Sequence, residues 1–174
     1  LILKRKWWRQ WVYPEWHAQA GQQMPLPEFF EVIQVYDTAL EEDEEADFSA
    51  QTTWGIFHHR ENEKDPKTGR ITDGRNRVCA MLLDMMEDKL EYPDLRQEIL
   101  DRYNEYKPDH VLIEKKASGH GLCQELRRKT IPIKAVKLTD GGDKVARAKT
   151  SSLMLEKGCI FYCPTKWALH VIDR

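Results

Sequence analysis

Apolar and polar positions follow two different periods along this chain, and the change comes near residue 93. Before it, runs rich in β-branched and aromatic residues alternate with polar segments, which is typical of strands joined by loops. These runs predict three strands, at residues 31–37, 50–58 and 77–86. We expect the acidic segment after the first strand and residues 59–76 after the second to form loops. Strands joined by loops rather than helices indicate an antiparallel meander.

The second part of the chain alternates between helical and strand-like patterns. Leu95, Ile99 and Tyr103 recur at helical spacing, and Pro93 suits the first turn of a helix. In order, the runs predict a helix at 93–106, a strand at 110–114, a helix at 118–129, a strand at 131–136, a helix at 143–156, a strand at 159–162 and a helix from 166. A meander followed by crossover units gives an α/β fold, with a mixed sheet and helices on both faces.

This element order resembles that of the RNase H-like fold. With strands numbered along the chain, we expect a five-stranded mixed sheet of order 3-2-1-4-5, in which the fourth strand lies parallel beside the first. We expect this domain to span residues 31–174. Residues 1–30 interleave cations with tryptophans, and Pro25 and Pro27 then interrupt any helix. We interpret this first segment as a linker or a strap over the core, with a DNA-touching arm as the alternative.

Charge is unevenly distributed, although the formal net charge is only −2. Residues 41–47 form an acidic block, whereas residues 127–149 carry eight basic side chains and two acidic ones, a local net of +6. Such a division favours a metal-binding acidic site beside a surface that attracts phosphate. Two solvated surfaces of opposite sign are the alternative, and charge alone does not distinguish them.

Several classes of protein are excluded by what the sequence lacks. The four cysteines form no CxxC pair and no His stands at zinc-finger spacing, so we expect free thiols in a reducing compartment. No apolar run reaches the ~20 residues that a membrane helix needs, and no signal peptide is present. No phosphate-binding G-x-x-x-x-G-K-[ST] loop occurs, so we expect no P-loop ATPase here. Leu1 in place of Met indicates a piece of a longer protein.

Two carboxylates are brought to one edge of the sheet by the expected topology. Asp37 ends the first strand and Glu114 ends the fourth, and the carboxyl ends of parallel neighbours share an edge. Two like charges held together need a counter-charge, and their oxygens suit Mg²⁺ or Mn²⁺. The corresponding chemistry is two-metal phosphodiester hydrolysis, with metals about 4 Å apart. From topology alone, two strand-end polar residues without a metal are an equal alternative.

Five short motifs in this order resemble those of phage terminase large subunits. They are Asp37-Thr38-Ala39 with Asp47-Phe48-Ser49 and Thr52-Thr53-Trp54-Gly55, then Leu90-Glu91-Tyr92-Pro93, Ile113–Gly119 with Leu122 and Gln124–Leu126, Asp143–Ala148, and Glu156-Lys157-Gly158. The resemblance covers roughly residues 31–174. It implies the nuclease domain of a large terminase, an RNase H-like, metal-dependent endonuclease that cuts double-stranded concatemeric DNA during genome packaging.

The resemblance also implies the site residues. Asp37 and Glu114 would bind the catalytic Mg²⁺ or Mn²⁺ ions. The family uses a third acidic ligand, which we expect beyond the end of this chain, and Asp173 is a weaker candidate. The chain departs from the family pattern at Lys115, where an acidic residue is common. A cation there would pair with phosphate or with Glu114 and weaken metal binding.

The candidates for DNA contact follow the fourth strand and lie on a later helix: Lys115, Lys116, Ser118, Gly119, Lys144, Arg147 and Lys149. A glycine at a helix start lets the backbone approach phosphate closely. Cations three residues apart share a helix face that can meet phosphates. A plain helix start and ordinary surface charges are the alternatives. We interpret Asp47 as a turn residue, and His120 as structural rather than accessory to the site.

Partners follow from the resemblance too: double-stranded DNA, an ATPase domain in the full-length chain, a small terminase subunit and a portal protein, with no membrane. The expected location is the cytoplasm of the infected bacterial host. Two other functions stay open at this point. One is a different RNase H-like nuclease, such as a junction resolvase or RNase H, and the other is a non-catalytic DNA-binding or docking module.

Overall fold

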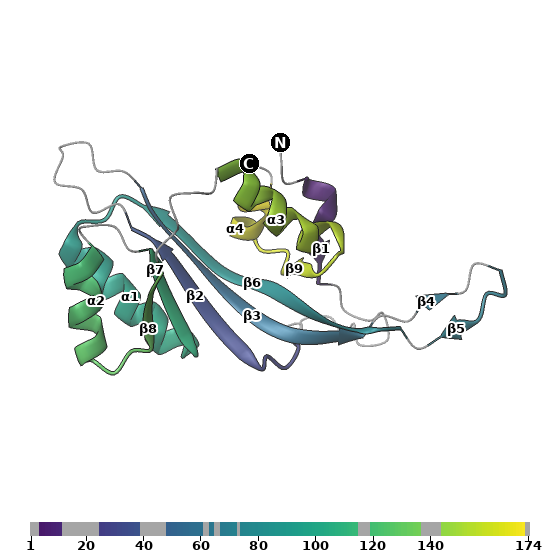
Figure 1. The fold of residues 1–174 in the computed structure, drawn as a ribbon, viewed down its shortest axis with the longest axis horizontal. Coiled ribbons are helices and arrows are strands. Elements are labelled where there is room, and N and C mark those ends of the chain that lie inside the picture. Colours follow the sequence, from purple (N-terminus) through teal and green to yellow (C-terminus); the bar gives the residue numbers. More distant parts are fainter. Residues whose placement is uncertain are drawn as a thin grey trace.

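A seven-stranded mixed sheet organises the chain in a computed structural model (Figure 1). The structure describes residues 4–11, 25–38, 48–60, 63–64, 67–72, 74–114, 119–136 and 144–172. Across the sheet, the strands are β1 (Arg9–Gln10), β9 (Ile160–Tyr162), β6 (Asn76–Asp88), β3 (Ser49–Arg60), β2 (Glu31–Asp37), β7 (His110–Glu114) and β8 (Ile133–Val136).

The five expected strands occur in the expected order. β2, β3 and β6 form the antiparallel meander, and β7 and β8 continue the sheet in parallel from β2. The expected total of five is too low, because β9 pairs with β6 and β1 pairs with β9, both in parallel. The sequence predicted the strand at residues 159–162 but not its position in the sheet. The two residues of β1 are too few for an alternating pattern to be seen.

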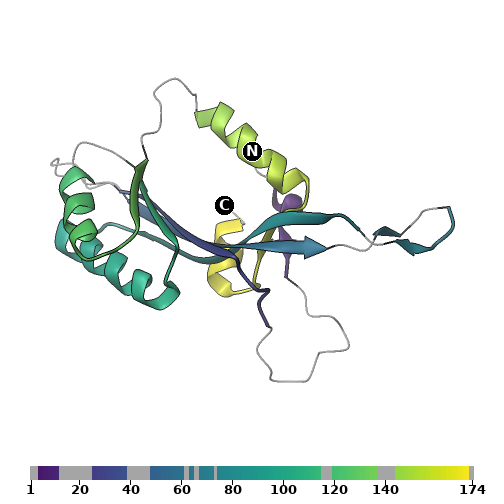
Figure 2. The same cartoon turned by 60° about the horizontal axis from the view of Figure 1, so that its bottom comes forward.

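The helices cover both faces of the sheet, as expected (Figure 2). On one face, α1 (Tyr92–Tyr106) and α2 (Gly119–Arg128) enclose a core of apolar side chains that includes Tyr36, Ile113 and Leu122. On the other face lie α3 (Lys144–Glu156) and α4 (Lys166–Ile172), which pack against β6 and β9. None of the described helices is long and apolar enough to span a bilayer.

The Trp-rich segment at the start of the described chain packs against the β9 half of the sheet. A short 3-10 helix, η1 (Arg5–Trp7), leads into β1. The Trp11 ring meets Phe57 and Phe161 edge-on, with 5.6 Å between ring centroids in each pair. Trp8 stacks on Trp54 at 6.5 Å from the opposite face. These rings shield parts of the sheet that α1 and α2 do not reach.

The hairpin between β3 and β6 is longer than its hydrophobic pattern predicted. β3 continues to Arg60 and β6 begins at Asn76, where the sequence suggested one long turn. Two short strands, β4 (Glu63–Lys64) and β5 (Ile71–Thr72), pair beyond them, so the arm projects from the body (Figure 1). Polar residues in an arm that extends into solvent carry no apolar alternation, so their pairing left no signal in the sequence.

Candidate functional site

The register between β2 and β7 brings two carboxylates side by side. The strands pair in parallel from Ile33 with His110 to Tyr36 with Ile113. The next step of the same register sets Asp37 beside Glu114, about one strand spacing or 4.8 Å away. Tyr36 and Ile113 are buried beneath α1 and α2, so the residues after them point to the opposite, open face. The expected adjacency of the two acids is confirmed.

Both acids line a hollow of about 230 Å³ on this open face. Its floor is apolar and comes from Val35, Leu112 and Val136, while Asp37 and Glu114 stand at the carboxyl ends of their strands. Asp37 is exposed and Glu114 is half-buried, so each keeps contact with solvent. Among the residues that line the hollow, charge therefore comes from the final residue of each of these two strands.

The donor set suits a hard divalent cation. Two carboxylates on adjacent strands offer oxygen ligands on the same side of the sheet, which Mg²⁺ and Mn²⁺ prefer. Within the described ranges, no group of three or more His, Cys, Asp or Glu side chains is arranged to hold a metal. Asp47 and Asp173 lie outside the described residues. Among the described residues, the candidate metal site therefore consists of the two carboxylates of Asp37 and Glu114.

The expected DNA contacts are placed only in part. Lys115, Lys116 and Ser118 lie outside the described residues, and they join the end of β7 to the first residue of α2, Gly119. Lys144 begins α3 and Arg147 lies in its first turn, whereas Lys149 is exposed farther along the same helix. Lys149 does not line the hollow. The roles of all these residues, and those of the two acids, stay predictions.

The family of the chain follows from a sequence profile described as "Terminase RNaseH-like domain". It matches residues 64–171, which is more than half of the chain and includes Glu114 with the hollow's β7 and β8 walls. The chain belongs to this terminase family. The resemblance suspected from the short motifs is thereby confirmed, as is the RNase H-like class of its fold.

Solved structures similar to this terminase domain include nucleases of thermophilic phages. The large terminase nuclease of phage G20c with bound zinc is 14% identical with a TM-score of 0.48, over 98% of this chain and 84% of that one. The nuclease domain of Thermus phage P74-26 is 12% identical with a TM-score of 0.49, over 97% and 74%. Thermus thermophilus RuvC is 13% identical with a TM-score of 0.39, over 61% of each chain. No curated protein matches the sequence.

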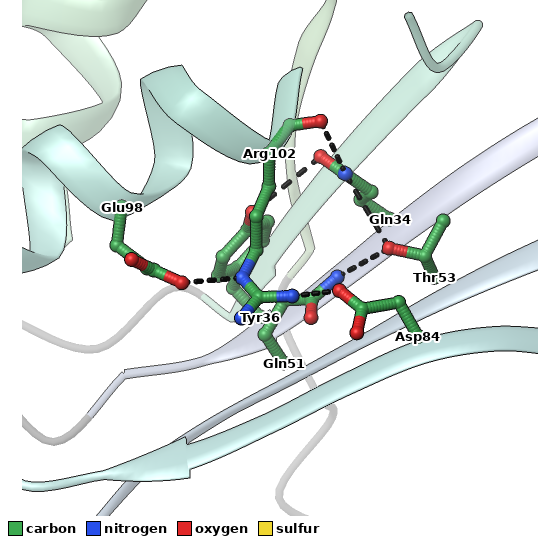
Figure 3. Close-up of polar contacts among 7 residues, drawn as sticks. All are labelled: Gln34, Tyr36, Gln51, Thr53, Asp84, Glu98 and Arg102. Atoms are coloured by element: carbon green, nitrogen blue, oxygen red, sulfur yellow. Dashed lines mark hydrogen bonds and ion pairs between the residues drawn. The ribbon is translucent and has the colours of Figure 1, made fainter. Parts of the chain in front are cut away.

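Directly beneath the acidic strand, the terminase domain buries a network of polar side chains (Figure 3). The side chains of Gln34 and Tyr36 of β2 lie on the α1 side of the sheet and are almost fully buried. The Gln34 amide donates to the Arg102 carbonyl at 3.1 Å and to the Thr53 hydroxyl at 3.4 Å. The Tyr36 hydroxyl donates to Gln34 Oε1 at 3.4 Å. β2 is therefore tied by side chains to both β3 and α1.

At the centre of this network is the Arg102 guanidinium. It forms an ion pair with Asp84 of β6 and another, at 2.5 Å, with Glu98 one turn earlier on α1. Burial raises the pKa of the Tyr36 hydroxyl, which therefore stays protonated and available as a donor. Sequence reasoning missed this network, because its members are isolated polar positions in strands and in a helix that lie far apart along the chain. The one available signal was that Gln34 interrupts the otherwise apolar run between Glu31 and Asp37.

Proposed function

We propose that this terminase domain is a metal-dependent endonuclease that hydrolyses double-stranded, concatemeric DNA during viral genome packaging. The observation that carries the proposal is the parallel β2–β7 register, which sets Asp37 beside Glu114 at the rim of one open hollow. Membership of the terminase RNase H-like family supports the same function. A rigid sheet edge that presents paired carboxylates to solvent is suited to hold cations against a DNA phosphate.

Asp37 and Glu114 would hold Mg²⁺ or Mn²⁺ through their carboxylate oxygens. When bound, the metal ions would supply Lewis-acid activation of water and stabilise charge on the leaving oxygen. A third acidic ligand, following this chain or supplied by Asp173, completes the proposal. The protein's own part is to fix the two strand ends, and the apolar floor of Val35, Leu112 and Val136 gives the DNA a surface that does not compete for the cations.

The DNA duplex would be held mainly through its phosphates. Lys115, Lys116, Ser118 and Gly119 connect Glu114 to α2, and Lys144, Arg147 and Lys149 lie on α3, so both groups belong to the proposed contact surface. Contacts of this kind orient DNA without reading sequence, and we expect cleavage with little sequence preference. The ATPase domain, the small terminase subunit and the portal complete the proposed packaging assembly in the infected bacterial cytoplasm.

The test is a plasmid-nicking assay with Mn²⁺, and in parallel with Mg²⁺. We expect the wild type to relax and linearise supercoiled plasmid, and Asp37→Asn and Glu114→Gln to do neither. The matched control is Asp94→Asn, which removes the same charge from an exposed position in the first turn of α1, on the opposite face of the sheet. It should nick like the wild type.

Three outcomes separate this proposal from its competitors. Metal-dependent nicking lost in both acid variants and kept in the control supports it. A wild type as inert as Asp37→Asn with both metals, in a protein that carries the proposed third acidic ligand, overturns it in favour of a DNA-binding module. A strong preference for RNA–DNA hybrids or four-way junctions over duplex DNA overturns the packaging assignment and indicates RNase H or a resolvase instead.

A further inference from the structure

Two polar side chains of β7 and β8 lie on the same open face as the acidic pair. Successive strand residues alternate between faces, so His110, Leu112 and Glu114 of β7 share one face. Lys134 of β8 is in register with Leu112 and therefore points the same way. The Lys134 ammonium lies 3.1 Å from His110 Nε2. The Lys134 ammonium and the His110 imidazole thus meet on the open face, at the opposite end of β7 from Glu114.

The charge of Lys134 is not neutralised within the described part of the chain. Its ammonium contacts an imidazole nitrogen, and no described carboxylate lies within ion-pair distance of it. The nearest acidic group of the cluster, Glu31, instead lies 3.3 Å from the same His110 Nε2. An exposed lysine whose ammonium contacts a ring nitrogen, rather than an acid, is available to bind an anion.

His110 is left with an unmet polar atom in this arrangement. Its Nδ1 is buried without a hydrogen-bond partner among the described residues, while Nε2 lies between a cation and a carboxylate. If Nε2 accepts from Lys134, Nδ1 carries a buried proton that has no acceptor. If Nε2 donates to Glu31, its proton faces an ammonium. An anion bound at Lys134 would accept the ammonium protons and relieve the second arrangement.

The spacing fits a DNA strand that also reaches the acidic pair. Glu114 lies four positions after His110, or about 13 Å farther along an extended strand. That distance corresponds to roughly four steps of the 3.4 Å axial rise of one DNA strand. The hollow at the Glu114 end is floored by the apolar side chains of Val35, Leu112 and Val136. Such a floor accepts sugar edges while charged groups bind phosphate at either end.

We propose that Lys134, oriented by His110, is a phosphate-binding site for the DNA substrate, a few nucleotides from the bond that is cut. This inference rests on the proposed nuclease function. It implies that the bound DNA strand runs along β7 and β8 across the open face of the sheet. Lys134 would be a positioning residue, because its ammonium contacts the DNA backbone but lies too far from the two acids to touch the reacting phosphate.

The experiment measures binding of a short DNA duplex by fluorescence anisotropy from low to high salt, with Ca²⁺ present. We expect Lys134→Gln to weaken binding several-fold at low salt and to reduce the slope of log K against log salt by about one. Lys134→Arg should keep the slope, because the positive charge is retained. Lys129→Gln, which removes an exposed cation from the end of α2 on the opposite face, should match the wild type.

Glu31 offers a variant with the opposite sign. Glu31→Gln removes the negative charge beside His110, so it should tighten DNA binding, whereas a merely structural role for this cluster predicts weaker binding or none of these changes. Because Lys134 is exposed, its variants should fold, and circular dichroism would establish this.

The outcomes separate this inference from the nuclease proposal. If Lys134→Gln leaves the salt slope of DNA binding unchanged, the phosphate site is overturned. The nuclease proposal is not, because it is tested separately by the nicking of plasmid by the wild type. A reduced slope in a protein that never nicks plasmid supports the phosphate site and overturns the nuclease. Absence of any salt-dependent binding by the wild type overturns the phosphate site directly.

Discussion

The Arg102 guanidinium of α1 is ion-paired with the Asp84 carboxylate of β6, beneath the strand that ends in Asp37 (Figure 3). Both side chains are less than a fifth exposed, at 18% and 16%. Removing the guanidinium leaves Asp84 and Glu98 without their common partner in a poorly solvated interface. Arg102→Met should therefore lower the free energy of unfolding by about 3 kcal/mol, measured by urea denaturation.

Arg96 supplies the matched control for that variant, since it belongs to the same helix. Its ion pair with Glu125 spans 2.7 Å, but both side chains are about a third exposed. We expect Arg96→Met to cost under about 1 kcal/mol. Equal losses in the two variants would contradict the view that burial makes the Arg102 cluster the stronger tie.

Two glycines should respond to alanine with opposite signs. A Cβ atom at Gly55 would lie 2.5 Å from the ring of Phe29, which packs edge-on against Phe57 at 6.1 Å. Moving that ring disturbs the core, so Gly55→Ala should destabilise the fold by about 1–3 kcal/mol. At Gly121, inside α2, a Cβ meets nothing within 4 Å.

Gly121→Ala should therefore stabilise the fold by about 0.5–1 kcal/mol, since alanine restricts the unfolded chain and favours helix. Differential scanning calorimetry of the two variants against the wild type would show the shifts in Tm. A stabilised Gly55→Ala would mean that the Phe29 ring is not held in the position described.

Divalent metal should stabilise the folded domain through the acidic pair. A ligand at a hundred times its Kd adds about 2.7 kcal/mol, so Mn²⁺ should raise the Tm of the wild type in a concentration-dependent way. Asp37→Asn and Glu114→Gln should lose most of that rise, while Asp94→Asn should keep it. EDTA should return all four proteins to their metal-free values. An identical rise in every variant would locate the metal elsewhere.

The thiol of Cys79 should be inert in the folded protein. Burial, and after it the neighbouring Cys159, raises the pKa of Cys79 to about 12. The thiolate is the reactive form, so it is scarce at neutral pH, and reaction in the native state should grow only as pH approaches that value. Pulsed iodoacetamide labelling at pH 8, read by mass spectrometry, should modify Cys79 after urea unfolding and leave it unmodified before. Rapid native labelling would contradict its burial.

The acidic pair was accessible to sequence reasoning because it depends on topology. The apolar runs of β2 and β7 end at Asp37 and Glu114, and a meander followed by a crossover leaves few ways to arrange these strands. Their adjacency follows once the strands are parallel neighbours. The bounds of both strands were predicted as the structure has them, since charged residues flank each apolar run.

The polar partners were not accessible in the same way. The contact between Gln34 and Arg102 joins residues 68 positions apart, and that between Lys134 and His110 depends on a register that no single strand reveals. Buried polar side chains also break the hydrophobic pattern on which the prediction of elements relies. β1 escaped notice for a third reason: its pairing with β9 is a property of the assembled sheet rather than of its own two residues.

The pairing of β1 with β9 constrains the order in which the sheet can fold during synthesis. Arg9 and Gln10 leave the ribosome long before Phe161 and Tyr162, the residues whose backbone they join. During synthesis the meander and the first crossover can form from consecutive segments, but β1 must wait for β9. In a nascent chain halted ahead of β9, Trp11 would lack Phe161, one of the two aromatic rings that it packs against edge-on, and this apolar surface would be open to chaperones.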